Sequence, residues 1–168
     1  PTENDNYFRN ARVHGTVHDM GAAMLGGVSG HAGLFGSARD VATVFQMLLQ
    51  EGNYGGVQYL RPETVRLFAH RYADETRRGL GFDMKQLNEN RRMNLSPFSS
   101  EGAFGHLGFT GIAAWADPVE DMVFVVLSNR TYPSMTNNTF GNLDTPLRLP
   151  SALYECILKG KSFEGKRG

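Results

Sequence analysis

The sequence predicts an α+β fold in which a mainly antiparallel sheet is flanked by helices. Two observations support this prediction. Helical patterns occupy the first half of the chain, whereas extended patterns begin after residue 78. The segments Gly111 to Ala116 and Met122 to Leu127 are joined by a turn-type cluster, as in an antiparallel hairpin. A helical pattern then closes the chain, and this segregation of helices from strands is typical of the α+β class.

Three helices are predicted in the first half of the chain. The first runs from Asp19, its N-cap, to Leu25. The second follows the N-cap Ser37, and its apolar side chains recur at helical spacing: Val41, Val44, Phe45 and Leu48. We expect Gly52 to end this helix in the C′ position. Pro62 begins the third helix, which runs towards His70.

The second half is predicted to hold strands and a closing helix. Leu80 to Met84 is an extended segment, and residues 85–102 form a polar connection. The segment 122–127 is apolar at every position, which suits a strand that is covered on both faces. The closing helix, Ser151 to Leu158 after Pro150, cannot cover both faces alone. We therefore expect an upstream portion to supply the other cover.

A glycine-rich segment connects the first two predicted helices. Residues 26–36 contain five glycines, which a helix does not tolerate because of their backbone entropy. We expect a tight, buried loop. Within it, His31 is expected to stabilise the loop through a hydrogen bond, in preference to facing a pocket.

Composition restricts the classes of partner. The 168 residues include 17 Lys and Arg and 17 Asp and Glu, so the formal net charge is zero. That balance argues against a nucleic acid or an anionic membrane as partner. No apolar stretch reaches the roughly 18 residues of a membrane span. The single cysteine, Cys156, lies in a helical pattern and is predicted to be a core residue.

No activated nucleophile is recognisable in the sequence. None of the nine serines is followed three residues later by lysine, and no tyrosine begins a Y-x-N motif. Ser29 follows Gly27 at elbow spacing, but His31 occupies the place of the second glycine. We expect no catalytic residue in this chain.

The histidines do not predict a metal site. His14 and His18 are four residues apart, but no Glu follows His14, so the H-E-x-x-H pattern fails. No metal and no cofactor is expected.

The segment Phe104-Gly105-His106-Leu107-Gly108-Phe109-Thr110-Gly111 is the most informative for chemistry. A donor side chain followed two residues later by glycine suits a strand edge that binds substrate. The side chain contacts a carboxylate or oxyanion, and the glycine leaves room for an acyl group. By itself the pattern is more typical of a glycine-rich strand corner.

Several segments in order carry a resemblance: 18–19, 26–35, 37–40, 78–83, 105–111 and 127–130. Together they resemble the C-terminal half of the serine-β-lactamase/penicillin-binding-protein-like superfamily, which includes class C β-lactamases and esterases. The likeness spans roughly residues 7–158. The chain is also similar to a bacterial subset in which such a domain follows a family 3 glycoside hydrolase (β-N-acetylhexosaminidase-like).

The resemblance implies an acyl-serine mechanism. The Lys/His-Thr/Ser-Gly motif maps to His106-Leu107-Gly108, where His106 provides charge and hydrogen bonding and Gly108 clearance. Phe109 would contribute its N–H to the oxyanion hole, with Thr110 beside it, and His31 and Leu107 would line the pocket. Leu107 departs from the motif because it lacks the usual hydroxyl, which argues against a penicillin-type carboxylate contact there.

The same resemblance places the serine nucleophile upstream of Pro1. Residues 1–168 would then be the C-terminal part of one domain. Within it, residues 1–77 would be mainly helix and loop, and residues 78–168 would form the strands and the closing helix. Because the sequence begins without Met, we expect a piece of a longer protein. The resemblance implies that this protein is periplasmic or secreted. The substrate would be a small molecule or a peptidoglycan fragment, and the upstream portion a partner.

An alternative function stays open. The chain could belong to a non-catalytic module that binds cell-wall fragments or supports a glycosidase domain. Several residues also have purely structural interpretations. We expect Trp115 to pack in the core, Asp19 and Asp40 to cap helices, and Arg130 to be an exposed charge at a strand end.

Overall fold

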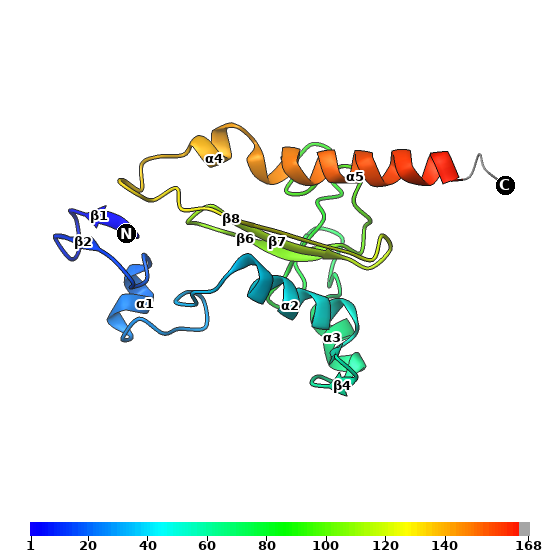
Figure 1. Cartoon of the computed structure of the whole chain (residues 1–168), viewed down its shortest axis with the longest axis horizontal. Helices are drawn as coiled ribbons and strands as arrows, with labels where there is room; N and C mark the ends of the chain where they lie inside the picture. Colours follow the sequence, from blue (N-terminus) through cyan, green and yellow to red (C-terminus); the bar gives the residue numbers. More distant parts are fainter. Residues whose placement is uncertain (165–168) are drawn as a thin grey trace.

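The computed structural model describes residues 1–164, with side chains as far as Leu158 (Figure 1). In chain order the elements are β1 (Glu3–Asp5), β2 (Ala11–Val13), α1 (Met20–Met24), α2 (Ala38–Leu49), β3 (Asn53–Tyr54), β4 (Val57–Gln58), α3 (Pro62–Phe68), β5 (Asp83–Met84), β6 (Phe104–Gly108), β7 (Ile112–Asp117), β8 (Met122–Leu127), α4 (Thr139–Asn142) and α5 (Thr145–Glu164).

Four strands form one antiparallel sheet in the order β5-β6-β7-β8. Figure 1 shows α2 on one side of this sheet and α5 on the other. Two short hairpins, β1–β2 and β3–β4, lie outside it. The predicted α+β fold with a flanked antiparallel sheet is therefore confirmed. Within this chain α2 packs against β7 and β8 on the second face, and the cover expected from an upstream portion stays a prediction.

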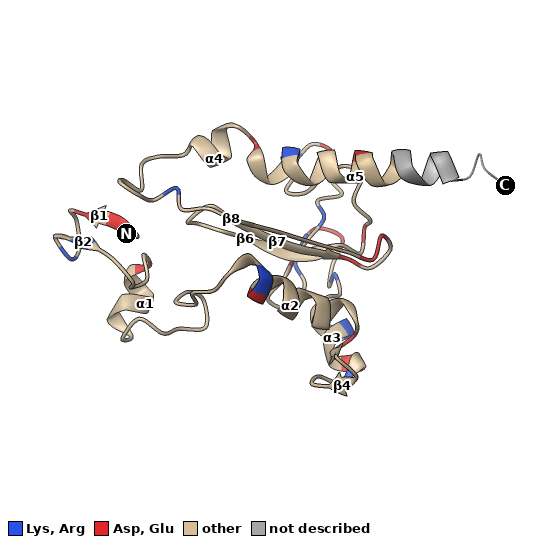
Figure 2. Ribbon diagram, in the orientation of Figure 1, with Lys and Arg blue, Asp and Glu red and all other residues tan. Residues whose placement is uncertain are grey.

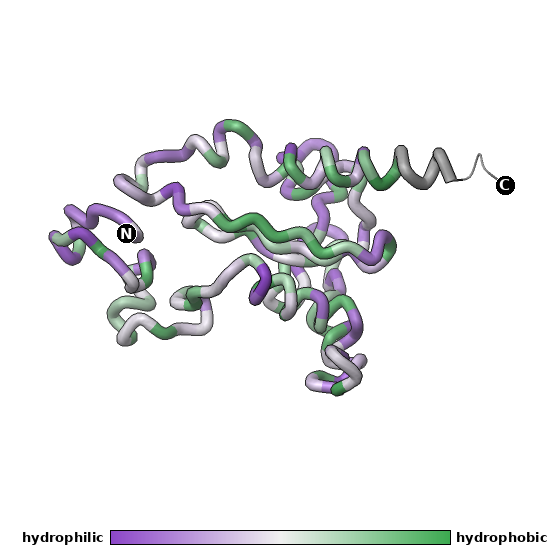
Figure 3. Tube along the Cα trace, in the orientation of Figure 1, coloured by the Kyte–Doolittle hydropathy of each residue, from purple (hydrophilic) through white to green (hydrophobic). Residues whose placement is uncertain are grey.

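The sheet separates two core clusters. One contains Leu95, Ala103, Ala113, Trp115 and Phe124. The other contains Met84, Phe104 and Ala116, and Phe45, Leu48 and Leu49 of α2 pack against it. Neighbouring residues of β7 and β8 alternate between the clusters because successive side chains of a strand point to opposite faces. Figure 3 shows β8 as a continuous apolar strand, as expected when both faces are covered.

Local capping chemistry defines both ends of α2. The Ser37 hydroxyl accepts from the Asp40 N–H, and the Asp40 carboxylate accepts from the Ser37 N–H, which completes a capping box. At the other end, Glu51 has a φ of 52° and the Gly52 N–H donates to the Met47 carbonyl at 2.8 Å. This is a Schellman arrangement with Glu51 at C′. The prediction of Gly52 at C′ is thus wrong by one residue.

The other helices and strands agree with the sequence in part. Asp19 caps α1 as predicted, since its Oδ1 accepts from the Ala22 N–H at 2.8 Å. The extended segment expected from residue 80 is only the two residues of β5, because Gly81, with a φ of 81°, turns the chain before it. α5 begins at Thr145 and contains Pro150, so treating Pro150 as the helix boundary is wrong. A proline in the second turn removes one hydrogen bond without ending the helix.

Two predictions of burial are also wrong. The glycine-rich loop is largely exposed: Leu34 is 97% and Phe35 65% accessible, because no described element packs over it. Cys156 is exposed as well. The buried side chain on this part of α5 is Tyr154, and residues two apart on a helix do not share a face.

Candidate functional site

Half of β6 is an open strand edge. β5 pairs only with Phe104 and Gly105, so on that side His106 to Gly108 has no strand partner among the described residues. The opposite side of β6 is fully paired with β7. His106, Gly108 and the following Phe109 are exposed. The motif residues predicted from sequence therefore lie together along one accessible edge.

Arg78 provides the positive charge at this edge. Its Nη1 lies 2.9 Å from Nε2 of His106 and 2.9 Å from Oδ1 of Asp83. Because a guanidinium can only donate, Nε2 of His106 accepts the bond. Nδ1 of His106 then carries the hydrogen and donates to the Leu107 carbonyl at 2.7 Å. In this arrangement His106 accepts from the guanidinium, so the positive charge at the edge is that of Arg78.

Sequence analysis missed the role of Arg78. Arg77 and Arg78 both bind Asp83, a buried carboxylate at the start of β5. An isolated bridge between Arg78 and Asp83 spans the turn that contains Gly81. Two consecutive arginines before a glycine turn were the available signal. Nothing in the local pattern indicates which histidine they would reach.

Leu107 lies away from the open edge. It is partly buried and packs against the cluster that contains Trp115 and Phe124. Its neighbours His106 and Gly108 are exposed, as the alternation along a strand requires. The residue that departs from the family motif is therefore a packing residue, and it does not face the edge. Trp115 packs in the core as predicted.

A three-residue turn, 109–111, connects β6 to β7. Gly111 has a φ of 93°, and its N–H donates to the Gly108 carbonyl at 3.0 Å. This left-handed position suits glycine. Among the described residues, no acceptor binds the backbone N–H of Phe109. That N–H is available for an external acceptor.

Arg130 holds this turn. Its backbone N–H donates to the Thr110 carbonyl at 2.9 Å, and its Nε donates to the Phe109 carbonyl at 2.5 Å. The guanidinium lies 4.1 Å from the centre of the Phe109 ring. Arg130 is half-buried, so the expectation of an exposed strand-end charge is wrong. Its side chain donates to the Phe109 carbonyl in the turn and to the carbonyls of Met135 and Asn137, so it ties the turn to the 135–137 segment.

A buried ionic cluster lies beside the same turn. β1 is the acidic strand in Figure 2; its Glu3 and Asp5 are buried and both bind Arg9. Burial would raise the pKa of Asp5, but hydrogen bonds from Arg9 and the backbone outweigh it and hold that pKa below its usual range. Glu3 also binds His18, whose ring stacks on Phe109 at 5.1 Å. The cluster thus contacts the turn through His18.

A family model described as Beta-lactamase matches residues 2–144. The chain belongs to the Beta-lactamase family. Two relatives, from Salmonella agona (strain SL483) and Escherichia coli (strain K12), bear the name "Putative D-alanyl-D-alanine carboxypeptidase". Each is 36% identical to this chain, over 159 and 155 residues respectively, and the matches cover 90% of the chain. The chain spans about a third of the relatives' length, 36% and 35%.

In this Beta-lactamase-family chain His31 stabilises the glycine loop. Its Nε2 lies 2.8 Å from Oδ1 of Asp19, and its Nδ1 lies 2.8 Å from the Ser29 hydroxyl. Hydrogen bonds from the Ala22 N–H and from His31 lower the pKa of Asp19. The predicted loop-stabilising bond is confirmed. No contact joins His31 to the open edge of β6 among the described residues.

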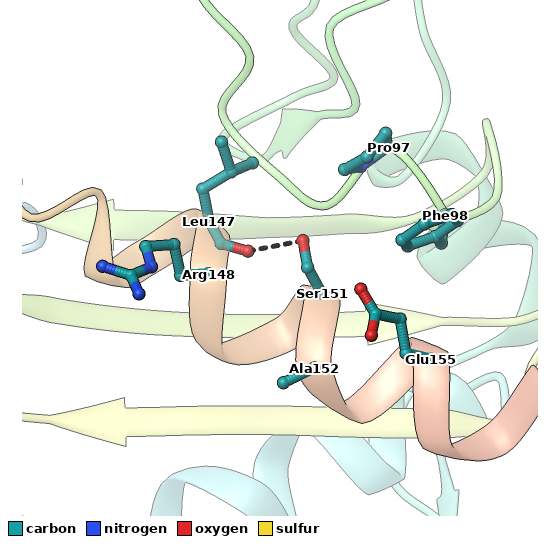
Figure 4. Close-up of a pocket in the computed structure, with 7 residues that line it drawn as sticks. All are labelled: Pro97, Phe98, Leu147, Arg148, Ser151, Ala152 and Glu155. Carbon is teal, nitrogen blue, oxygen red and sulfur yellow. Dashed lines mark hydrogen bonds between the residues drawn. The ribbon is translucent and has the colours of Figure 1, made fainter.

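Two hollows of the surface lie away from the open edge of β6. The larger, of about 440 Å³, lies between α5 and the 97–98 segment (Figure 4). It is lined by Pro97, Phe98, Leu147, Arg148, Ser151, Ala152 and Glu155. A second, of about 290 Å³, is apolar and is lined by residues of α2 and α3 together with Leu60 and Phe82. Neither hollow includes a residue of β6.

The described part of this Beta-lactamase-family chain contains no cluster of three His, Cys, Asp or Glu side chains placed to hold a metal ion. None of its described helices is long and apolar enough to cross a membrane. The open edge of β6 itself presents strand backbone, a glycine, an imidazole and a guanidinium.

Proposed function

We propose that this chain supplies the substrate-binding edge and half of the oxyanion hole of a serine hydrolase. The substrate would be an amide or ester derived from the cell wall, cleaved through an acyl-serine. The observation that carries the proposal is the open half of β6. The Arg78 guanidinium, the His106 ring and the Phe109 N–H all lie at this accessible edge. Membership of the Beta-lactamase family supports the reaction class.

The proposed role of Phe109 follows from its backbone. An oxyanion that forms when a serine attacks a carbonyl needs donors that are already oriented. The Phe109 N–H is unoccupied by described acceptors, and Arg130 holds its carbonyl. One such donor contributes roughly 3–4 kcal/mol to lowering a barrier of this kind. Gly108, one residue before, leaves space for the acyl group.

The proposed role of Arg78 concerns the substrate's charge. A guanidinium at an exposed edge forms strong charge-assisted hydrogen bonds with a carboxylate. The side chain of Arg78 is 50% accessible, so one side of it faces solvent. Peptides that end in a free carboxylate suit this edge, in line with the carboxypeptidase name of the relatives. β-Lactam hydrolysis is less favoured, since the hydroxyl residue of the family motif is replaced by Leu107, which packs in the core.

In this proposal the serine nucleophile lies upstream of this chain in the full-length protein. No S-x-x-K or Y-x-N occurs among the 168 residues. The upstream serine would attack the carbonyl, the leaving group would depart with a proton, and water would then hydrolyse the acyl-serine. A cell-wall substrate implies an extracytoplasmic location for the protein.

Leu107, which stands where the family motif has a hydroxyl residue, favours a second candidate. In that case the chain belongs to a non-catalytic module that binds cell-wall fragments or supports a neighbouring glycosidase. The open edge would then bind a peptide without cleaving it.

Labelling with a fluorophosphonate distinguishes the two candidates. The full-length protein is incubated with the probe, its intact mass is measured, and peptide mapping locates the adduct; a heat-unfolded sample is the control. We expect one adduct, on a serine outside this chain, in the folded sample only. A well-folded protein without an adduct would overturn the catalytic proposal in favour of the binding module.

A further inference from the structure

A buried carboxylate fixes the plane of one histidine ring. Glu3 has no accessible surface, and its carboxylate accepts from the Tyr7 hydroxyl at 2.8 Å and from Arg9 at 3.0 Å. Oε1, which accepts from Arg9, also lies 2.9 Å from Nδ1 of His18. Because an oxygen bound to a guanidinium acts as an acceptor, Nδ1 carries a hydrogen and donates to it.

The backbone of His18 is held by the same cluster. Arg9 donates from Nη1 to the Val17 carbonyl at 2.6 Å and from Nη2 to the His18 carbonyl at 2.8 Å. Arg9 is itself bound to Asp5 at 2.7 Å. Both the main chain and the ring of His18 therefore have few alternative positions.

The fixed ring lies flat against Phe109. The two ring centres are 5.1 Å apart and their planes differ by 10°, within the range of about 4.5–7 Å that is typical of aromatic pairs. Phe109 is 60% exposed, and among the described residues Arg130 also restrains it, through contacts with both its ring and its carbonyl. Side chains from two distant parts of the chain thus hold one turn residue.

We infer that His18, oriented by Glu3, is a positioning residue for the backbone N–H of Phe109. This rests on the proposed function, in which that N–H stabilises an oxyanion. If the Phe109 ring is free to move, its backbone N–H moves with it. A hydrogen-bond donor that is displaced from the oxyanion loses most of its effect on the transition state. The stack acts on the turn whether or not the protein is an enzyme.

Three variants of the full-length protein separate the stack from the hydrogen bond. His18→Gln keeps an amide that can donate to Glu3 and removes the ring. His18→Phe keeps the ring and removes the donor. Tyr7→Phe removes a different hydrogen bond from Glu3 and leaves the stack intact, so it is the matched control. The readouts are amide hydrogen exchange of the 105–112 segment and steady-state kinetics with a peptide or ester substrate.

We expect His18→Gln to speed exchange in that segment and to lower kcat about tenfold with little change in KM, because a transition-state contact is weakened. His18→Phe, which keeps the stack but loses the bond that orients its ring, should lie between His18→Gln and wild type in both readouts, and Tyr7→Phe should leave them unchanged. Unchanged exchange in His18→Gln, or an equal effect of Tyr7→Phe, would overturn the inference. Faster exchange in a protein without hydrolytic activity would uphold the positioning and refute only the proposed function.

Discussion

Nη1 of Arg78 lies 2.9 Å from Nε2 of His106 at the unpaired half of β6. The same nitrogen lies 2.9 Å from the Asp83 carboxylate. The contact gives the edge a single cation on the arginine and a neutral imidazole beside it. Two predictions follow from this pair, and three more from the packing and titration of buried residues.

Replacing Arg78 by Gln should weaken binding of substrates that end in a carboxylate. We expect KM for such a peptide to rise about tenfold, because a charge-assisted hydrogen bond is worth more than about 1.4 kcal/mol. An ester without a carboxylate should be hydrolysed as before. Arg77→Gln is the control, since Arg77 binds Asp83 and has no contact with His106 among the described residues. Equal losses for both substrates would contradict the proposed role.

The tautomer of His106 can be measured directly. We expect long-range nitrogen–proton NMR spectra at neutral pH to show a hydrogen on Nδ1 and none on Nε2, because Nε2 accepts from Arg78 and Nδ1 donates to the Leu107 carbonyl. The exposed His14 serves as an internal reference. A hydrogen on Nε2 would mean that the pair does not form in solution.

Gly105 should not tolerate a side chain. A Cβ there would lie 2.1 Å from the Ala114 carbonyl oxygen and 2.7 Å from the Trp115 side chain, both of which are in the packed sheet. We expect Gly105→Ala to lower the free energy of unfolding by about 3 kcal/mol in urea denaturation. Gly30→Ala is the matched control, since nothing lies within 4 Å of its added Cβ. A Gly105→Ala protein as stable as this control would contradict the packing of β6 on β7.

Tyr154 ties α5 to the sheet. Its hydroxyl donates to Oδ2 of Asp117 at 2.6 Å, and both residues are buried. Tyr154→Phe should therefore lower the free energy of unfolding by about 1.5–3 kcal/mol, as expected for a hydrogen bond to a charged group. Thermal or urea unfolding measures this. Burial, together with Asp117, raises the pKa of Tyr154 above its ordinary value, so its contribution should fall only above about pH 10.

Acid should destabilise the fold through Asp117 and Asp5. Burial would raise the pKa of Asp117, but hydrogen bonds from Ser100 and Tyr154 outweigh it and lower that pKa from 3.8. The pKa of Asp5 is lowered from the same value. Below about pH 4 the unfolded chain binds more protons than the folded one, so stability present above that pH is lost as the pH falls.

Asp117→Asn isolates one of these two carboxyl groups. The variant should be less stable at neutral pH and should lose less stability than wild type between about pH 4 and pH 2, because it no longer has that carboxyl group to protonate. Urea unfolding at a series of pH values gives the slope of the free energy of unfolding against pH for the variant and for wild type. Identical slopes for variant and wild type would show that Asp117 does not contribute to acid unfolding.

Local chemistry explains what was predictable from the sequence. The capping residues Asp19 and Ser37 act on N–H groups within three residues of themselves, so their helices begin where the sequence indicates. The β7–β8 hairpin joins neighbouring apolar segments through a short turn. The α+β class follows from these local elements, and the motif around His106 follows from the order of its residues.

Only the tertiary structure decided the chemistry of the edge. The contact of Arg78 with His106 joins residues 28 apart and places a guanidinium beside the imidazole. The stack of His18 on Phe109 joins the first segment to the turn after β6. Cys156 looked like a core residue because its neighbours are apolar, yet the rotation of α5 buries Tyr154 and exposes the thiol. Pairings between distant segments depend on how the elements pack, and the spacing of residues along the chain carries no record of that packing.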